Sequence, residues 1–118
     1  IHGLGNYTRD FTFINDTING IFLASTKGTY GEAYNIGTGV ETSVSDLGKL
    51  VIKKMNLSNK KIHFTRNRTF QIYRRCADIS KAKNDLGYTP STSLSAGVSK
   101  TISFFEQVSR NQNKIKNH

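Results

Sequence analysis

The sequence predicts an α/β fold in which short strands alternate with short helices. Two observations support this prediction. Segments rich in aromatic and β-branched residues alternate along the 118-residue chain with segments whose apolar residues recur at helical spacing. Glycine or capping residues stand between many of these segments. Three or four short strands with short helices build only a thin core, so we expect part of a larger body.

The first third of the chain predicts a strand, a helix and a second strand. Residues 9–14 (RDFTFI) favour a strand because they are rich in aromatic and β-branched side chains. Asn15 and Asp16 are predicted to cap the helix over residues 17–26, where apolar side chains recur at i, i+3 and i+4. Residues 32–36 (EAYNI) favour the second strand.

The middle of the chain predicts a capped helix followed by two more strands. Ser43, with Asp46 three residues later, resembles a capping box at the start of a helix over residues 44–55. Residues 61–65 (KIHFT) favour a third strand, and residues 73–77 favour a short fourth one.

Two further helices close the sequence. Asp78 is predicted to cap a helix over residues 79–86, and Gly87 is predicted to end it in a left-handed conformation. Ser93 is predicted to cap the last helix, whose end from Ser109 we expect to fray. Its apolar face consists of Leu94, Val98, Ile102 and Phe105.

The formal net charge of +9 favours an anionic partner. Much of the charge lies in residues 60–75 and 110–118, and neither segment contains an acid. Charge alone leaves nucleic acid, an acidic membrane surface and a phosphorylated small molecule open, as well as a basic surface without a partner.

Several classes of site are disfavoured by the sequence. Cys76 is the only cysteine, so no disulfide forms within the chain and a reducing, cytoplasmic setting is expected. We expect Cys76 to be a small buried side chain on a strand, although Arg74 and Arg75 beside it leave a lowered thiol pKa open. The three histidines lack metal-ligand spacing, and no segment approaches the ~20 apolar residues that span a bilayer.

The catalytic pair of a short-chain dehydrogenase is also missing from the sequence. That chemistry needs a tyrosine with a lysine four residues later, and none of the five tyrosines has one. Residues 37–39 (GTG) begin like a dinucleotide-binding fingerprint, but the third glycine is missing. We interpret them as a tight turn.

Arg9 is the most informative single cation. It stands where a glycine loop meets the first predicted strand, and its guanidinium can present two donors to one phosphate. From composition alone, a structural pair with Asp10 is the favoured alternative. Arg66 and Arg68 lie in a predicted loop, and spacing does not show whether they converge with Arg9.

Four blocks of sequence, in order and over roughly residues 1–106, resemble the extended short-chain dehydrogenases that act on nucleotide sugars. These include epimerases, 4,6-dehydratases and decarboxylases. The blocks are GLGNYTRDFTFIND at residues 3–16, GEAYNIGTG at residues 31–39 followed by residues 43–47, RCADISKAKNDLG with YTP at residues 75–90, and residues 94–105.

The resemblance implies a small mixed α/β portion of an extended Rossmann-type enzyme. Residues 1–108 would be its C-terminal substrate-binding region, and residues 109–118 a basic tail. The NAD-binding Rossmann domain, with the catalytic Tyr and Lys, would precede Ile1, so this chain alone is expected to hold no NAD and to lack activity, and it need not dimerise. The implied partner is a nucleotide-diphosphate sugar, with no nucleic acid or membrane, and the full-length enzyme would be a homodimer formed through the absent half.

The resemblance also assigns five substrate-binding residues. Arg9 and Arg68 would contact the diphosphate, while Phe11 and Asn35 would lie near the nucleotide. Gln71 stands where many members have an acid that binds the ribose, so it can hydrogen-bond a hydroxyl but adds no charge.

The implied reaction begins with hydride transfer from the sugar C4 to NAD, which gives a 4-keto intermediate. Epimerisation, water loss and decarboxylation all remain open as its fate. Two other functions remain open: a basic nucleic-acid-binding module, because aromatic residues alternate with arginines over residues 63–75, and a non-catalytic sugar-nucleotide sensor, because of Gln71.

Overall fold

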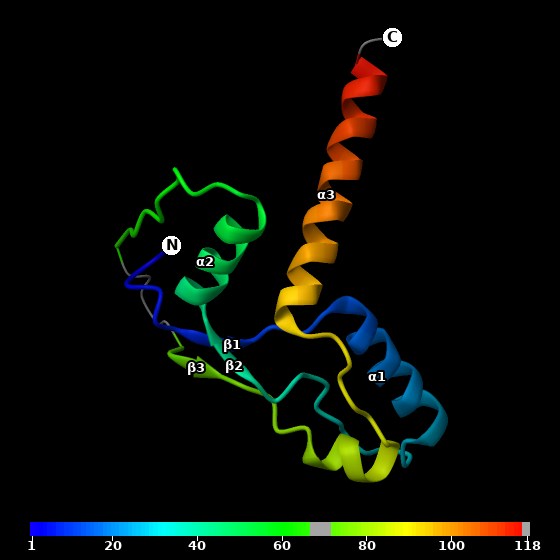
Figure 1. Cartoon of the computed structure of the whole chain (residues 1–118). Coiled ribbons are helices and arrows are strands. Elements are labelled where there is room, and N and C mark those ends of the chain that lie inside the picture. The colour runs from blue at the N-terminus through cyan, green and yellow to red at the C-terminus, as the bar shows by residue number, and fades with distance from the viewer. Residues whose placement is uncertain (67–71, 117–118) are drawn as a thin grey trace.

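A three-stranded mixed sheet lies between the helices of this chain (Figure 1). The computed structural model describes residues 1–66 and 72–116. In the sheet order β2-β1-β3, the central strand pairs antiparallel with β2 and parallel with β3. The predicted α/β class is therefore confirmed. The elements are β1 (Thr8–Asp10), α1 (Ile14–Lys27), β2 (Glu41–Ser43), α2 (Val44–Lys54), β3 (Arg74–Arg75), the π-helix η1 (Ala82–Leu86) and α3 (Leu94–Lys116).

The helix α1 begins earlier than the sequence predicts. Phe13 is its extended N-cap residue and makes no side-chain capping bond, so the first strand ends at Asp10. The prediction that Asn15 and Asp16 cap the helix is wrong, because both lie inside its first turn. The Asp16 carboxylate is buried and accepts hydrogen bonds from the segment that leads into α3.

Two predicted strands do not form as predicted. Residues 32–36 run without strand pairing, and Tyr34 and Ile36 pack instead against the core beside α1 and η1. Residues 61–65 make a single bridge, from Thr65 to His2. Strand character depends on a partner strand as well as on composition, and these segments have no partner ladder among the described residues.

The start of α2, the end of η1 and the start of α3 follow their predicted local chemistry. At the start of α2, the Ser43 hydroxyl accepts a hydrogen bond from the Asp46 N–H at 3.0 Å and donates one to the Asp46 carboxylate at 2.7 Å. Asp78 accepts from the Ser80 N–H at 2.9 Å, ahead of the unexpectedly wide π-helical turn of η1. Gly87 ends that turn at φ 68°. Ser93 accepts from the third residue of α3 at 3.3 Å.

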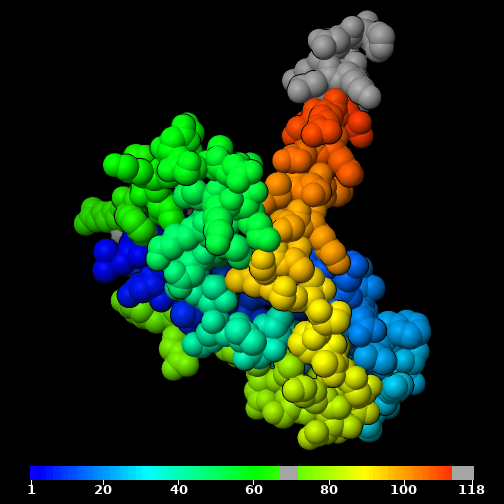
Figure 2. Space-filling model, in the orientation of Figure 1, coloured from blue at the N-terminus to red at the C-terminus, as the bar shows by residue number. Residues whose placement is uncertain are grey.

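The helix α3 is longer than its predicted apolar stripe. It extends to Lys116 and projects beyond the rest of the molecule (Figures 1 and 2). Whether residues 109–118 form a separate tail stays a prediction. No helix in the described ranges is both long and apolar enough to cross a bilayer.

The buried core is small and lies where η1 packs under α1. It consists of Ile79, Ala82, Leu86 and Tyr88. The molecule exposes 8938 Å² of surface, whereas a compact monomer of 13.2 kDa exposes roughly 6,400 Å². Its radius of gyration is 17.7 Å, against about 13.5 Å for a compact domain of this length. The expected thin core is therefore present.

The predicted apolar face of α1 does not point into this core. Ile18, Ile21 and Phe22 are 57%, 61% and 62% exposed, and Ile14 is 58% exposed. The opposite side of the helix packs inward through Leu23 and Ala24. A row of apolar side chains thus remains uncovered along α1, which we call the α1 ridge.

Candidate functional site

A polar hollow of about 350 Å³ lies beside strands β1 and β3. The paired strands contribute Arg9 and Arg75, and the segment before the 37–39 turn contributes Asn35. Asp10, Thr12 and Cys76 also contribute to its polar lining. The structure therefore brings the two predicted site residues Arg9 and Asn35 together in one hollow, although they are 26 positions apart in the sequence.

Arg9 is held by its own strand rather than by an acid. Its Nη1 donates to the carbonyl oxygen of Thr8 at 2.6 Å, and the side chain is half-buried. None of the ion pairs within residues 1–66 and 72–116 involves Arg9, so the alternative in which Arg9 pairs with Asp10 is wrong. Among the described residues the guanidinium forms no other hydrogen bond, so its remaining donors are open to a ligand.

Asp10 is occupied by the turn at residues 37–39. Its carboxylate accepts from the N–H groups of Thr38 and Gly39, each at 2.9 Å, and from the Thr38 hydroxyl. Burial raises the pKa of Asp10. The hydrogen bonds from Thr38, Gly39 and Ala77 together lower the pKa by more than burial raises it, so the pKa lies below 3.8. Asp10 is therefore a charged anchor for the turn.

The same contacts decide the role of the partial glycine fingerprint. A dinucleotide phosphate would need the N–H groups of Thr38 and Gly39, and Asp10 already accepts from both. The approach is close, since a Cβ at Gly37 would lie 2.5 Å from the Asp10 carboxylate. These residues form a tight turn and do not fit NAD.

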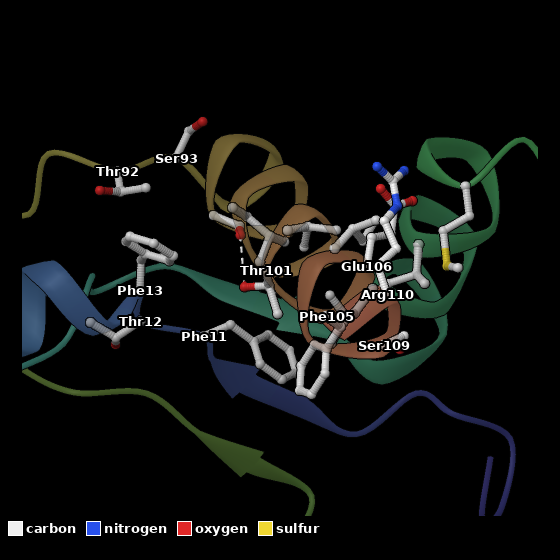
Figure 3. Close-up of a pocket in the computed structure, with 17 residues that line it drawn as sticks. Phe11, Thr12, Phe13, Thr92, Ser93, Thr101, Phe105, Glu106, Ser109 and Arg110 are labelled. Carbon is white, nitrogen blue, oxygen red and sulfur yellow. Dashed lines mark hydrogen bonds between the residues drawn. The ribbon is translucent and has the colours of Figure 1, made fainter. Parts of the chain in front are cut away.

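Phe11 lies in a different cavity from Arg9. It lines an apolar groove of about 800 Å³ between α2 and α3, where its ring faces that of Phe105 (Figure 3). The predicted apolar face of α3 also lines this groove. The groove is larger than the polar hollow, and its charged lining side chains among the described residues are Glu106 and Arg110. Two other predicted residues, Arg68 and Gln71, lie outside the described residues.

Asn35 bridges two segments of the hollow. Its Nδ2 donates to the carbonyl oxygen of Asp78 at 3.1 Å, which connects the segment before the 37–39 turn to the start of the η1 region. This contact uses one donor of the amide, and the rest of the side chain is exposed. Asn35 is thus positioned by the fold and retains further hydrogen-bonding capacity.

Cys76 does not behave as predicted. Its side chain is exposed at the hollow rather than buried. Desolvation, followed by the negative charges of Asp10 and Glu41, raises the pKa of the Cys76 thiol above 9.0. The alternative of a lowered thiol pKa is therefore wrong, and the hollow contains no activated thiolate. Among the described residues, no group of His, Cys, Asp and Glu could hold a metal ion.

A comparison with protein families shows the family of this chain. A family model described as GDP-mannose 4,6 dehydratase matches residues 1–101. The chain belongs to this family. Its relatives among the extended short-chain dehydrogenases include UDP-glucose 4-epimerase from Mycolicibacterium smegmatis, 31% identical over 110 residues, and dTDP-glucose 4,6-dehydratase from an Actinoplanes species, 29% identical over 105 residues.

Solved structures of family members have the same fold in this region. UDP-glucose 4-epimerase from Thermotoga maritima, crystallised with UDP-glucose, superposes with a TM-score of 0.86 at 33% identity. UDP-glucuronic acid 4-epimerase from Bacillus cereus, in a complex that contains NAD, gives a TM-score of 0.84 at 34% identity. Both comparisons cover 92% of this chain.

The matches cover most of this chain but only part of each relative. The chain spans about a third of each relative: 35% and 33% of the two enzymes matched by sequence, and 34% and 35% of the two structures. Arg75 is the hollow residue that sequence reasoning missed. It lies at the first position of the third family block, but only the strand register places it beside Arg9.

Proposed function

We propose that this chain is the substrate-binding part of an NAD-dependent nucleotide-sugar epimerase or dehydratase. The observation that carries the proposal is the Arg9 guanidinium. It is half-buried in a polar hollow without a carboxylate partner among the described residues, and it stands at the arginine of a family motif. A cation in that setting favours a phosphate ligand.

In this proposal the hollow positions the substrate, and the chemistry takes place elsewhere. Arg9 binds the diphosphate, with Arg68 as a second contact, while Asn35 and Gln71 act on the nucleotide side. Phe11 would contact the nucleotide from the neighbouring apolar groove. Their contribution is binding energy and orientation of the sugar for transfer of the C4 hydride. A 4-keto sugar would be the intermediate.

NAD and the Tyr/Lys pair would be supplied by an N-terminal Rossmann half, so this chain alone would be inactive. The α1 ridge supports such a half, because Ile14, Ile18, Ile21 and Phe22 form an exposed apolar row that an adjoining domain would cover. The large exposed surface and the large radius of gyration also support an adjoining half. We propose that the whole enzyme is a cytoplasmic homodimer assembled through that half.

Titration calorimetry of the chain tests the proposal with UDP-glucose, UDP-glucuronic acid, dTDP-glucose and GDP-mannose. We expect at least one of them to bind, and Arg9→Gln to weaken that binding about 30-fold, which corresponds to about 2 kcal/mol. Arg74→Gln is the matched control, because Arg74 lies one strand away, pairs with Glu41 at 3.1 Å and does not line the hollow.

Two results would contradict the proposal. One is equal weakening by Arg9→Gln and Arg74→Gln. The other is salt-dependent binding to single-stranded DNA or RNA together with no binding of any nucleotide sugar, which would favour the nucleic-acid module.

A further inference from the structure

Arg75 stands directly beside Arg9 on the sheet. The two residues are register partners in the parallel pair of β1 and β3. Neighbouring strands lie about 4.8 Å apart, and partners in register share a face of the sheet. Both arginines line the polar hollow, with Asn35 across from them on the 35–37 segment.

Neither cation of this pair has an ion-pair partner among the described residues. Two guanidinium groups on one face repel each other unless an anion lies between them. Among the described residues that line the hollow, Asp10 is the one acid; its negative charge reduces this repulsion, but its oxygens are bound by Thr38 and Gly39 and by neither arginine.

The preceding residue shows the opposite arrangement. Arg74 donates from Nε to the Glu41 carboxylate at 3.1 Å and from Nη2 to the same carboxylate at 3.1 Å. Arg74 is thus neutralised within the protein, whereas Arg75 is exposed and borders the hollow. One residue of the Arg74–Arg75 pair has a structural partner, and the other is open to a ligand.

We propose that Arg75 is a further diphosphate-binding residue, which acts together with Arg9. This inference rests on the proposed function and names a contact at the same site. Each guanidinium can present two parallel donors to one phosphate, so two of them match the two phosphates of a diphosphate. The hollow of about 350 Å³ accommodates that group, and part of its nucleotide or sugar must lie outside it.

The test compares Arg75→Gln with Arg74→Gln, which remove the same charge from adjacent positions of one strand. UDP, UDP-glucose and UDP-glucuronic acid are titrated into each chain by NMR, with uridine as the uncharged probe. We expect Arg75→Gln to weaken UDP and UDP-glucose about 10-fold each, and Arg74→Gln less than 2-fold. We also expect the side-chain Nε–H resonances of both Arg9 and Arg75 to shift when UDP binds to the unsubstituted chain.

Salt dependence and a charge-preserving variant sharpen the test. The UDP affinity of Arg75→Gln should fall less steeply with salt than that of the unsubstituted chain, because one phosphate contact is gone. Arg75→Lys should bind UDP with intermediate affinity, since it retains the charge but loses the planar fork. Circular dichroism should show unchanged melting for both variants, because the side chain is exposed.

The possible failures are distinguishable. Equal effects of Arg75→Gln and Arg74→Gln on UDP would overturn the inference and leave the Arg9 site intact. Weakening confined to UDP-glucuronic acid would also overturn it, because Arg75 would then face the sugar carboxylate. No binding of any nucleotide or nucleotide sugar by the unsubstituted chain would instead overturn the proposed function itself.

Discussion

Replacing Asp16 should destabilise the fold more than any exposed charge substitution. The Asp16 side chain is 3% exposed and lies in the first turn of α1. Its carboxylate accepts from the Ser91 N–H at 3.0 Å, the Ser91 hydroxyl at 2.9 Å and the Thr92 N–H at 3.0 Å. It therefore connects α1 to the segment that leads into α3.

The magnitude follows from the donors left behind. Asp16→Ala leaves two backbone N–H groups and one hydroxyl without their acceptor, and each buried unsatisfied donor costs about 1–3 kcal/mol. These donors are only partly buried, so the lower value is appropriate and the sum is about 3 kcal/mol. That loss should lower the Tm by roughly 10–15 °C for a chain of this size.

Urea unfolding followed by circular dichroism measures the loss. Asp85→Ala is the matched control, because the Asp85 side chain is exposed and forms no hydrogen bond or ion pair among the described residues. Its free energy of unfolding should change by about 0.5 kcal/mol or less. Equal losses for the two variants would refute the reasoning that the three contacts stabilise the fold.

The pH dependence offers an independent measurement. Burial raises the pKa of Asp16. The hydrogen bonds from Ser91 and Thr92 together lower the pKa by more than burial raises it, so the pKa in the folded chain lies below 3.8. A carboxyl with a depressed folded pKa adds stability above its unfolded pKa, near ~3.9, and loses it as the pH falls through the folded value. The unsubstituted chain should therefore lose more stability than Asp16→Asn on acidification below about pH 4, and parallel curves would contradict this account.

Three further predictions concern single contacts. Tyr88→Phe should lower the free energy of unfolding by about 1–2 kcal/mol in urea titrations, because the buried Tyr88 hydroxyl donates to the Gly37 carbonyl at 2.9 Å. Gly37→Ala should cost about 2 kcal/mol or more, because its Cβ would lie 2.5 Å from an Asp10 oxygen, and a thermal melt with unchanged Tm would contradict this. Ser43→Ala should cost about 1 kcal/mol by loss of the α2 cap, and Ser43→Asp should restore most of that stability.

Local chemistry made the helix ends predictable from the sequence. Ser43, Gly87 and Ser93 act through neighbours within five residues, so their roles can be predicted without knowing the fold. Residues 32–36 and 61–65 have strand-like composition, but pairing depends on segments far away in the sequence. Their predicted strands were wrong because no partner strand pairs with them in the described fold.

The candidate site was predictable only in part, for the same physical reason. Arg9 and Asn35 stand in motifs that resemble a known family, and the structure places both at one hollow. Phe11 follows Arg9 closely but lines the apolar groove beside α3, which depends on how that helix packs. Arg75 became visible only through the β1–β3 register, since no sequence spacing relates it to Arg9.

The position of Asp10 has a consequence for how substitutions at this site are interpreted. Asp10 follows Arg9 in one short strand, and its carboxylate is fully committed to the 37–39 turn. A screen scored by ligand affinity would group Asp10 with the direct contacts, since losing the anchor would displace its neighbour. Only a parallel measurement of thermal stability would distinguish a residue that contacts the ligand from one that, like Asp10, stabilises the backbone around the ligand site.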